Sequence, residues 1–268
     1  MNRIDLRFRE LRSNAQAAFI PYLTAGDPDL DTTRDLILEA EKSGADLIEL
    51  GIPFSDPIAD GPVIQASHTR ALQRGVRVND VLEMVASLRK ATDIPIVAMI
   101  SCSIVFRKGV PDFINAMASA GFDGATIPDL PVEEAGAVRE AADRAGLHLA
   151  PFVTPTTTPQ RRDAACRAAR GFIYYISVVG LTGAREDLAA DLKTNVDLLR
   201  ATAQAPVAVG FGVSKPRQAR QVGAVSDGVI VGSALVRLIA ENASAGPQAL
   251  RSRFGEMVKS LSDAAKQR

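Results

Sequence analysis

Short apolar runs alternate with longer amphipathic segments from one end of the chain to the other. The runs are rich in β-branched residues, and several are apolar at every position, as expected of strands that are covered on both faces. They lie at residues 18–23, 47–52, 94–100, 125–127, 147–153, 172–176, 207–210 and 228–231. Strands that alternate with helices favour βα units in a parallel sheet, and eight such runs indicate an α/β fold, a single (β/α)8 TIM barrel.

The segments between the runs have helical composition and length. The clearest are residues 31–43, 79–91, 110–120, 131–145 and 216–222. Apolar residues at helical spacing also occur outside these units. They are Ile4, Phe8 and Leu11 near the start, and Leu250, Phe254, Met257 and Leu261 near the end. The first set predicts an additional N-terminal helix, and both sets fit helices that pack on the barrel. Because no linker rich in proline, glycine and serine divides the chain, we expect residues 1–268 to form a single domain.

A short motif recurs where a helical segment meets an apolar run. Gly44-Ala45-Asp46 precedes the second run, Gly121-Phe122-Asp123 precedes the fourth, and Ser226-Asp227-Gly228 stands at the start of the eighth. Glycine commonly ends a helix, so the motif indicates that one helix ends and the next strand begins. A repeat of this kind is typical of a fold built from similar units.

Composition changes this picture mainly by exclusion. The 268 residues are 47% hydrophobic, and 31 Lys and Arg balance 31 Asp and Glu, so the charge does not favour nucleic acid or an anionic membrane. Cys102 and Cys166 lack the spacing of a zinc site or a disulfide framework. The first residues lack the apolar stretch of a secretory signal, and no run reaches the ~18 apolar residues of a membrane span. We therefore expect a cytoplasmic protein that binds a small molecule or a protein partner.

Two glycine motifs follow the last two apolar runs. Gly210-Phe211-Gly212 follows the seventh run and Gly232-Ser233-Ala234 follows the eighth, and each leads into a helical segment. In TIM barrels the loops at these positions commonly bind phosphate, because glycine lets free backbone N–H groups approach the anion. Either motif alone fits a tight turn equally well. The two motifs in consecutive units predict a phosphate site.

A third glycine cluster, from Gly180 to Arg185, follows the sixth run. The connection is longer than a usual βα loop, which has about two to six residues. It is either a surface loop without a role or a lid over the site, and its place at this face of a barrel favours the lid.

A carboxylate stands inside the second apolar run. Glu49 lies near the carboxyl end of this run, where a buried charge is costly unless it is paired or takes up a proton. None of the eight runs contains Lys or Arg, so a general acid or base with a raised pKa is favoured over a structural ion pair. The proline-stiffened loop that follows carries Asp56 and Asp60. Either could face Glu49, and either could be a turn residue.

The histidines and aromatic residues carry less information. His68 and His148 lack the spacing of metal ligands, so we predict structural roles for both and no metal site. Aromatic residues at or just beyond the ends of the runs either line a flat apolar pocket or fill the core. They are Tyr22, Phe54, Phe152, Tyr174, Tyr175 and Phe211.

Residues 49–62, which read Glu-Leu-Gly-Ile-Pro-Phe-Ser-Asp-Pro-Ile-Ala-Asp-Gly-Pro, closely resemble the signature of tryptophan synthase alpha subunits. Further motifs resemble that family in the same order, at residues 21–28, 128–134, 181–183, 210–213 and 232–234. The first motif is highly specific, whereas the glycine motifs alone are not. The resemblance covers nearly the whole chain. It implies a barrel lyase that splits indole-3-glycerol phosphate into indole and glyceraldehyde 3-phosphate in tryptophan biosynthesis.

The resemblance also implies roles for single residues. Glu49 would act as general acid and base at indole C3, Asp60 would bind the ring N–H and stabilise its positive charge, and Tyr174 matches the family's active-site tyrosine. The implied phosphate ligands are Gly183, Phe211, Gly212, Gly232 and Ser233, and the expected pocket residues are Tyr22, Met99 and Thr182. No cofactor is implied for this chain, because pyridoxal phosphate belongs to the beta subunit, with which it would form an alpha2-beta2 tetramer.

One segment departs from the family. Ser101 and Ser103 stand where the family more often has Tyr and Asn, near the active-site mouth and the beta-subunit contact. The departure bears on coupling to the partner more than on the lyase reaction. Two alternatives are another phosphate-binding barrel enzyme, acting on a phosphorylated sugar or anthranilate derivative, and a catalytically silent barrel that only activates a beta subunit. The frame from Glu49 to Asp60 argues against the first, and the presence of both acids argues against the second.

Overall fold

The computed structural model describes residues 1–177, 188–210 and 212–267, so Thr182, Gly183 and Phe211 lie outside the described residues. The strands are β1 (Ala18–Thr24), β2 (Ile48–Gly51), β3 (Ile96–Met99), β4 (Gly124–Thr126), β5 (His148–Leu149), β6 (Phe152–Val153), β7 (Ile173–Ile176), β8 (Val207–Gly210) and β9 (Gly228–Val231). Neighbouring strands pair in parallel, in the order β5-β4-β3-β2-β1-β9-β8-β7-β6.

The two strands at the ends of this order are consecutive in the chain. Only Ala150 and Pro151 separate β5 from β6. The Ala150 N–H donates to the Ala125 carbonyl at 3.0 Å, and the Tyr174 N–H donates to the Pro151 carbonyl at 2.9 Å. The predicted run 147–153 is therefore one barrel strand, interrupted where Pro151 has no N–H to give to a ladder. The sheet closes on itself, and the predicted (β/α)8 barrel is confirmed.

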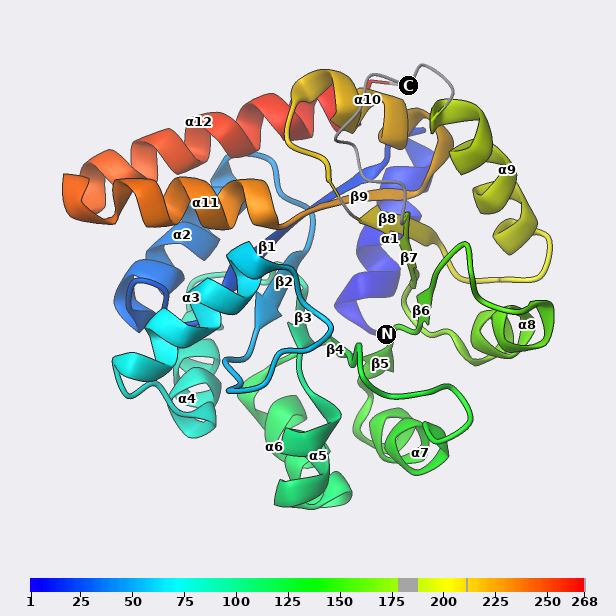
Figure 1. Ribbon diagram of the computed structural model, residues 1–268, viewed down its shortest axis with the longest axis horizontal. Helices are drawn as coiled ribbons and strands as arrows, with labels where there is room; N and C mark the ends of the chain where they lie inside the picture. The colour runs from blue at the N-terminus through cyan, green and yellow to red at the C-terminus, as the bar shows by residue number, and fades with distance from the viewer. Residues whose placement is uncertain (178–187, 211, 268) are drawn as a thin grey trace.

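Helices surround the barrel on its outer side (Figure 1). They are α1 (Arg3–Ser13), α2 (Leu30–Lys42), α3 (Pro62–Gln73), α4 (Val78–Leu88), α5 (Cys102–Lys108), α6 (Val110–Ala120), α7 (Gly136–Ala145), α8 (Pro159–Ala168), α9 (Leu188–Arg200), α10 (Pro216–Val225), α11 (Ser233–Asn242), the 3-10 helix η1 (Ala243–Ala245) and α12 (Pro247–Ala265). The predicted helix 131–145 begins later than expected, because Pro131 to Glu134 form a turn closed by a 3.0 Å backbone hydrogen bond. Within the described ranges no helix combines the length and the apolar character needed to cross a membrane.

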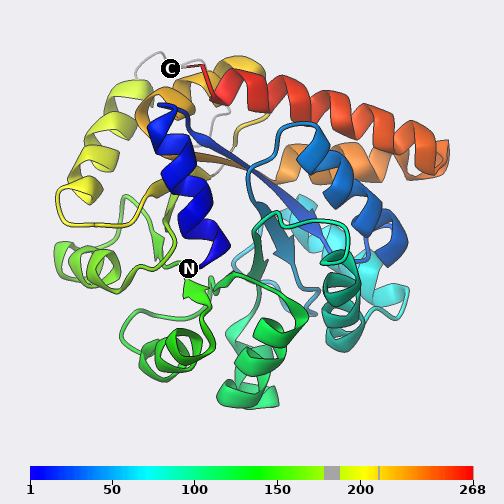
Figure 2. The same ribbon diagram turned by 180° about the vertical axis from the view of Figure 1, so that it is seen from behind.

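The predicted N-terminal helix covers one end of the barrel. Ile4, Phe8 and Leu11 of α1 are buried against side chains of the barrel interior, Leu47 and Phe172 among them. Figure 2 shows α1 lying across the end where the strands begin. This end is therefore plugged by apolar side chains, and the opposite end, where the strands finish, is left for ligands.

The aspartates of the recurring motif, where a helical segment meets a strand, share a structural role. The carboxylate of Asp46 accepts from the Phe19 N–H at 2.7 Å, that of Asp123 accepts from the Ile96 N–H at 2.9 Å, and that of Asp227 accepts from the Val207 N–H at 2.9 Å. Each aspartate thus starts its own strand and holds the first residues of a neighbouring strand. An arginine neutralises each carboxylate: Arg7 at 2.5 Å, Arg89 at 2.8 Å and Arg200 at 2.8 Å, respectively.

Candidate active site

Inward-facing side chains at the carboxyl ends of the strands gather around Glu49. Tyr22 on β1 and Glu49 on β2 are register partners, so their side chains point to the same face of the sheet. Glycines make room for the phenols: a Cβ on Gly51 would lie 2.0 Å from the Tyr22 hydroxyl, and one on Gly210 would lie 2.7 Å from the Tyr174 ring. Side chains at these two glycines would collide with the phenols of Tyr22 and Tyr174.

Glu49 is only 2% exposed, and its hydrogen-bond partners are hydroxyl groups rather than cations. The Thr126 hydroxyl donates to Oε1 at 3.3 Å, and the Tyr174 hydroxyl donates to Oε2 at 3.4 Å. Burial raises the pKa of Glu49 to about 8, and the negative charge of Asp60 adds to the rise, while the two hydrogen bonds oppose it. The carboxyl group therefore holds its proton at neutral pH, as its place inside an apolar run predicts.

The loop between β2 and α3 carries both candidate aspartates, and it places them in different environments. Asp60 is half-buried, and burial together with the charge of Asp129 raises its pKa to about 6. Asp56 is exposed and accepts a 2.6 Å hydrogen bond from Ser55. Gln65 of α3 donates to the Asp60 carbonyl at 2.8 Å and thereby fixes the end of the loop. Of the two residues, Asp60 is the one whose charge acts on Glu49.

Tyr22 and Met99, both expected in the pocket, lie together. Tyr22 belongs to a small apolar cluster with Ile64 and Val236, and Met99 packs against that cluster. The Tyr22 hydroxyl lies 3.0 Å from Nε2 of His68. The sequence predicts a structural role for His68, and the fold places it at the small hollow that Asp60 and Met99 also line. No local pattern marks this position, because Tyr22 is 46 residues away in the chain.

The aromatic residues divide between the pocket and the core. The ring centroid of Tyr174 lies 4.6 Å from that of Phe152, at the same end of the barrel as Glu49. Tyr175, the next residue along β7, is 2% exposed and packs in the core between the sheet and the helices. Phe54 packs against the same core. Tyr174 therefore lies beside Glu49 at the mouth of the barrel, whereas Tyr175 fills the core, and the pocket role of Tyr22 and Tyr174 stays a prediction.

The expected phosphate site consists of backbone at the glycine turns that contain Gly212 and Gly232. Gly212 has φ 78°, a left-handed conformation that glycine adopts without strain. Gly232 follows β9 and precedes α11, whose N-terminus receives no side-chain cap. A Cβ on Gly232 would lie 3.5 Å from that of Tyr22, so this helix N-terminus adjoins the pocket wall. The first N–H groups of a helix have no partner inside the helix and favour an anion.

The segment from Ser101 to Ser103, which departs from the family, is hydrogen-bonded to Asp129 at the mouth of the barrel. Ser101 caps α5 by accepting from the Ser103 N–H at 3.2 Å, and its hydroxyl donates to Asp129 at 2.6 Å. The Cys102 N–H donates to the other Asp129 oxygen at 2.8 Å. Ser101 and Asp129 line a hollow of about 30 Å³ together with Asp60, so this segment is part of the site's rim.

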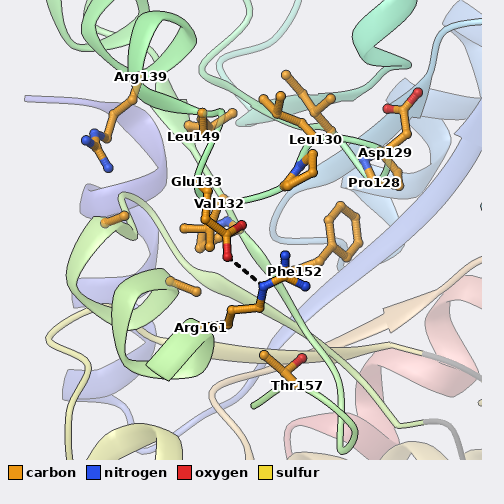
Figure 3. Close-up of a pocket in the computed structure, with 17 residues that line it drawn as sticks. Pro128, Asp129, Leu130, Val132, Glu133, Arg139, Leu149, Phe152, Thr157 and Arg161 are labelled. Atoms are coloured by element: carbon orange, nitrogen blue, oxygen red, sulfur yellow. Dashed lines mark hydrogen bonds and ion pairs between the residues drawn. The ribbon is translucent and has the colours of Figure 1, made fainter. Parts of the chain in front are cut away.

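A larger hollow of about 340 Å³ lies between the β4–α7 connection and α8, where Arg161 pairs with Glu133 at 2.6 Å (Figure 3). It contains neither Glu49 nor Tyr174. We therefore place the candidate active site inside the barrel mouth. Among the residues whose positions are given, His, Cys, Asp and Glu form no group able to hold a metal ion.

Comparison with known proteins gives a consistent answer. Residues 8–266 match the family model described as tryptophan synthase alpha chain. The chain is 47% identical over 261 residues to the tryptophan synthase alpha chain of Geotalea uraniireducens, covering 97% of each chain. It is 45% identical over 241 residues to that of Caldanaerobacter subterraneus subsp. tengcongensis, covering 90% of this chain and 92% of the relative.

A solved structure agrees with the sequence relatives. The crystal structure of tryptophan synthase subunit alpha from Legionella pneumophila superimposes with a TM-score of 0.91 at 37% identity, covering 99% of this chain and 98% of the other. The family model spans the barrel from α1 to α12, including the acid pair and both glycine turns of the described site. The chain therefore belongs to the tryptophan synthase alpha chain family.

Proposed function

We propose that this protein cleaves indole-3-glycerol phosphate into indole and glyceraldehyde 3-phosphate, the lyase step of tryptophan biosynthesis. The separation of the pKa values of the two acids supports this most directly: about 8 for Glu49 and about 6 for Asp60. At neutral pH Glu49 carries a proton and most Asp60 side chains are ionised. Two neighbouring carboxyl groups with separated pKa values can supply a proton donor and an anion at once.

In the first step, Glu49 donates its proton to C3 of the indole ring. C3 becomes tetrahedral, and the ring nitrogen becomes a cationic iminium N–H. The Asp60 carboxylate accepts a hydrogen bond from this N–H and stabilises its positive charge. Because Asp60 is half-buried, the interaction is stronger than it would be in water.

In the second step, the carbon–carbon bond between C3 and the glycerol chain breaks. The Glu49 carboxylate takes the proton of the adjacent hydroxyl group, whose oxygen becomes the aldehyde oxygen. The electrons of the broken bond return to the ring and neutralise the iminium nitrogen, which releases indole. Glu49 ends with its proton restored, so the cycle involves proton transfer alone and calls for no cofactor on this chain.

The remaining residues hold the substrate. Tyr22, Met99 and Tyr174 would contact the indole ring. The Tyr174 hydroxyl, which donates to Glu49 at 3.4 Å, would orient that carboxyl group. Gly232 and Ser233 would receive the phosphate through backbone N–H groups at the α11 N-terminus, and Gly212 would do so from the loop between β8 and α10. Thr182, Gly183 and Phe211 complete the proposed set and lie outside the described residues.

We further propose a beta subunit as partner, in an alpha2-beta2 assembly, and a place in the cytoplasm. Membership in an alpha-chain family supports a second type of chain. Ile58, in the loop that carries Asp60, and Phe106, on α5, are exposed large apolar side chains, which suit contact with a protein partner.

The function is tested by incubating the purified chain with indole-3-glycerol phosphate and following indole. The chain contains no tryptophan, so indole fluorescence is read against little protein background. We expect release of indole and glyceraldehyde 3-phosphate in equal amounts. A wild-type protein that releases neither product, with or without a beta subunit, would contradict the proposal.

A further inference from the structure

His68 joins two parts of the site that are distant in sequence. It lies on α3 and is 4% exposed. Each of its two ring nitrogens lies within hydrogen-bond distance of another group. Nδ1 accepts a hydrogen bond from the Phe54 backbone N–H at 3.1 Å, at the start of the loop that carries Asp60. Nε2 lies 3.0 Å from the hydroxyl of Tyr22 on β1. The ring therefore spans from the acid loop to the pocket wall.

These contacts fix the tautomer of His68. Because Nδ1 accepts from a backbone N–H, it carries no proton, and a neutral ring must then carry its proton on Nε2. Nε2 accordingly donates to the Tyr22 oxygen. A protonated ring would place an N–H at Nδ1 against the Phe54 N–H, and the contact would be lost.

The surroundings keep the ring neutral. Burial lowers the pKa of His68 to about 4, although the negative charge of Asp27 favours the charged form. Asp27 is itself paired with Arg70 of α3 at 2.6 Å. Asp56, Asp60 and Asp129 line the same small hollow as His68. Despite these carboxylates, a ring with this pKa is uncharged throughout the neutral range.

The helix that carries His68 holds the loop at both of its ends. His68 binds the loop at Phe54, and Gln65, three residues earlier on α3, donates to the carbonyl of Asp60 at 2.8 Å. The same helix contacts β1 at a second point, where the hydroxyl of Ser67 lies 2.6 Å from that of Thr24. Thr24 in turn donates to the Tyr22 hydroxyl at 3.2 Å.

We propose that His68 is a positioning residue of the lyase site, whose neutral ring sets the distance between the Tyr22 hydroxyl and the loop that carries Asp60. The inference rests on the proposed function and adds a residue that acts through Tyr22 and the Phe54 backbone. Nothing in the geometry brings His68 itself to the reacting atoms. Its effect should therefore fall on turnover, because misplacement of the acid loop weakens the transition state more than substrate binding.

Two substitutions separate the two contacts. In His68→Asn the amide oxygen can replace Nδ1 as acceptor for Phe54, but nothing reaches Tyr22. In His68→Gln the longer amide can reach the Tyr22 hydroxyl, but the Phe54 contact is lost. We expect each to lower kcat for indole release about tenfold, with KM changed by less than about twofold. His148→Asn is the matched control, because His148 pairs with Asp5 at 2.8 Å near α1, away from the mouth, and should leave kcat unchanged.

A double-mutant cycle tests the path through Tyr22. Tyr22→Phe removes the hydroxyl group that His68 holds. If His68 acts through that group, adding His68→Asn to Tyr22→Phe should lower kcat little further. Fully additive losses of kcat would overturn this path.

Nitrogen NMR of the ¹⁵N-histidine-labelled protein supplies a readout that does not depend on activity. The chain contains 2 histidines, so His68→Asn and His148→Asn assign both rings. At neutral pH we expect a proton-bearing Nε2 and an unprotonated Nδ1 for His68. A charged ring, the opposite tautomer, or variants with wild-type kcat would overturn the inference while the wild-type protein still releases indole. Failure of the wild-type protein to release indole would instead overturn the proposed function itself.

Discussion

The hydroxyl group of Tyr174 on β7 donates a 3.4 Å hydrogen bond to Oε2 of Glu49 on β2, across 125 residues of sequence. The bond favours the ionised carboxyl group, whereas burial of Glu49 and the charge of Asp60 favour the protonated one. Burial is the larger influence, so the pKa stays raised. Tyr174 is therefore placed to adjust how far the pKa of Glu49 rises.

This relationship predicts the pH dependence of indole release. The value of kcat/KM should rise as Asp60 loses its proton near pH 6 and fall as Glu49 loses its proton near pH 8. Tyr174→Phe removes a hydrogen bond that lowers the pKa of Glu49, so the alkaline limb should move to higher pH. Steady-state rates across the pH range measure both limbs. A limb that moves to lower pH would contradict the role given to Tyr174.

Glu49→Gln should fold and lose turnover by at least about a hundredfold, since the amide cannot donate a proton to carbon. A rate above about a tenth of the wild-type value would rule out Glu49 as the acid.

The pH dependence of folding stability gives a second check on the raised pKa of Glu49. The folded protein keeps the Glu49 proton up to about pH 8, whereas the unfolded chain releases it near the ordinary value of 4.5. Between these values the unfolded state binds fewer protons, so wild-type stability falls as pH rises. The urea midpoint of the Glu49→Gln variant minus that of the wild type should therefore become larger as the pH rises through this range.

The two aspartates of the acid loop form a matched pair. Asp60→Asn should lower indole release by about tenfold or more, because the amide cannot neutralise the cationic ring nitrogen. Asp56→Asn should leave the rate of the isolated chain unchanged, since Asp56 is exposed and bonded to its neighbour Ser55. Indole fluorescence measured for both variants decides the assignment. Equal losses in the two variants would mean that the loop, rather than one carboxylate, is required.

A charge at Gly212 should repel the substrate phosphate. Gly212→Asp should strongly weaken binding of glycerol phosphate, measured by titration calorimetry. Because Gly212 has φ 78°, any side chain there is strained, so Gly212→Asn is the control for strain without charge. We expect the aspartate variant to bind much more weakly than the asparagine variant. Equal affinities in the two variants would place the phosphate elsewhere.

Binding of a beta subunit should raise lyase turnover by ordering the rim of the site. We expect a stable complex with the beta subunit of the same organism and a weaker response to one from a distant source, because Ser101 and Ser103 replace larger residues common in the family. Gel filtration and indole release measured together provide the test. No complex at micromolar concentrations, combined with unchanged lyase activity, would leave a lyase that works alone.

The sequence by itself determined the architecture and the chemistry of single positions. The run 228–231 coincides with β9, and the helix predicted at 110–120 coincides with α6. Both depend on neighbours in sequence, through periodicity and the glycines that end helices. The apolar run around Glu49 likewise indicates a raised pKa, because nearby strand residues are enough to desolvate a carboxyl group.

Only the tertiary structure decided which residues meet. It brings the charge of Asp60 to Glu49, places the Tyr174 hydroxyl beside Glu49 and Tyr175 in the core, and brings His68 to Tyr22. It also gives the recurring aspartates their role, since Asp46 binds the backbone of Phe19 in the neighbouring strand. The physical reason is the same in each case. Closure of the sheet brings together residues that are dozens of positions apart in the chain, and no local spacing encodes those distances.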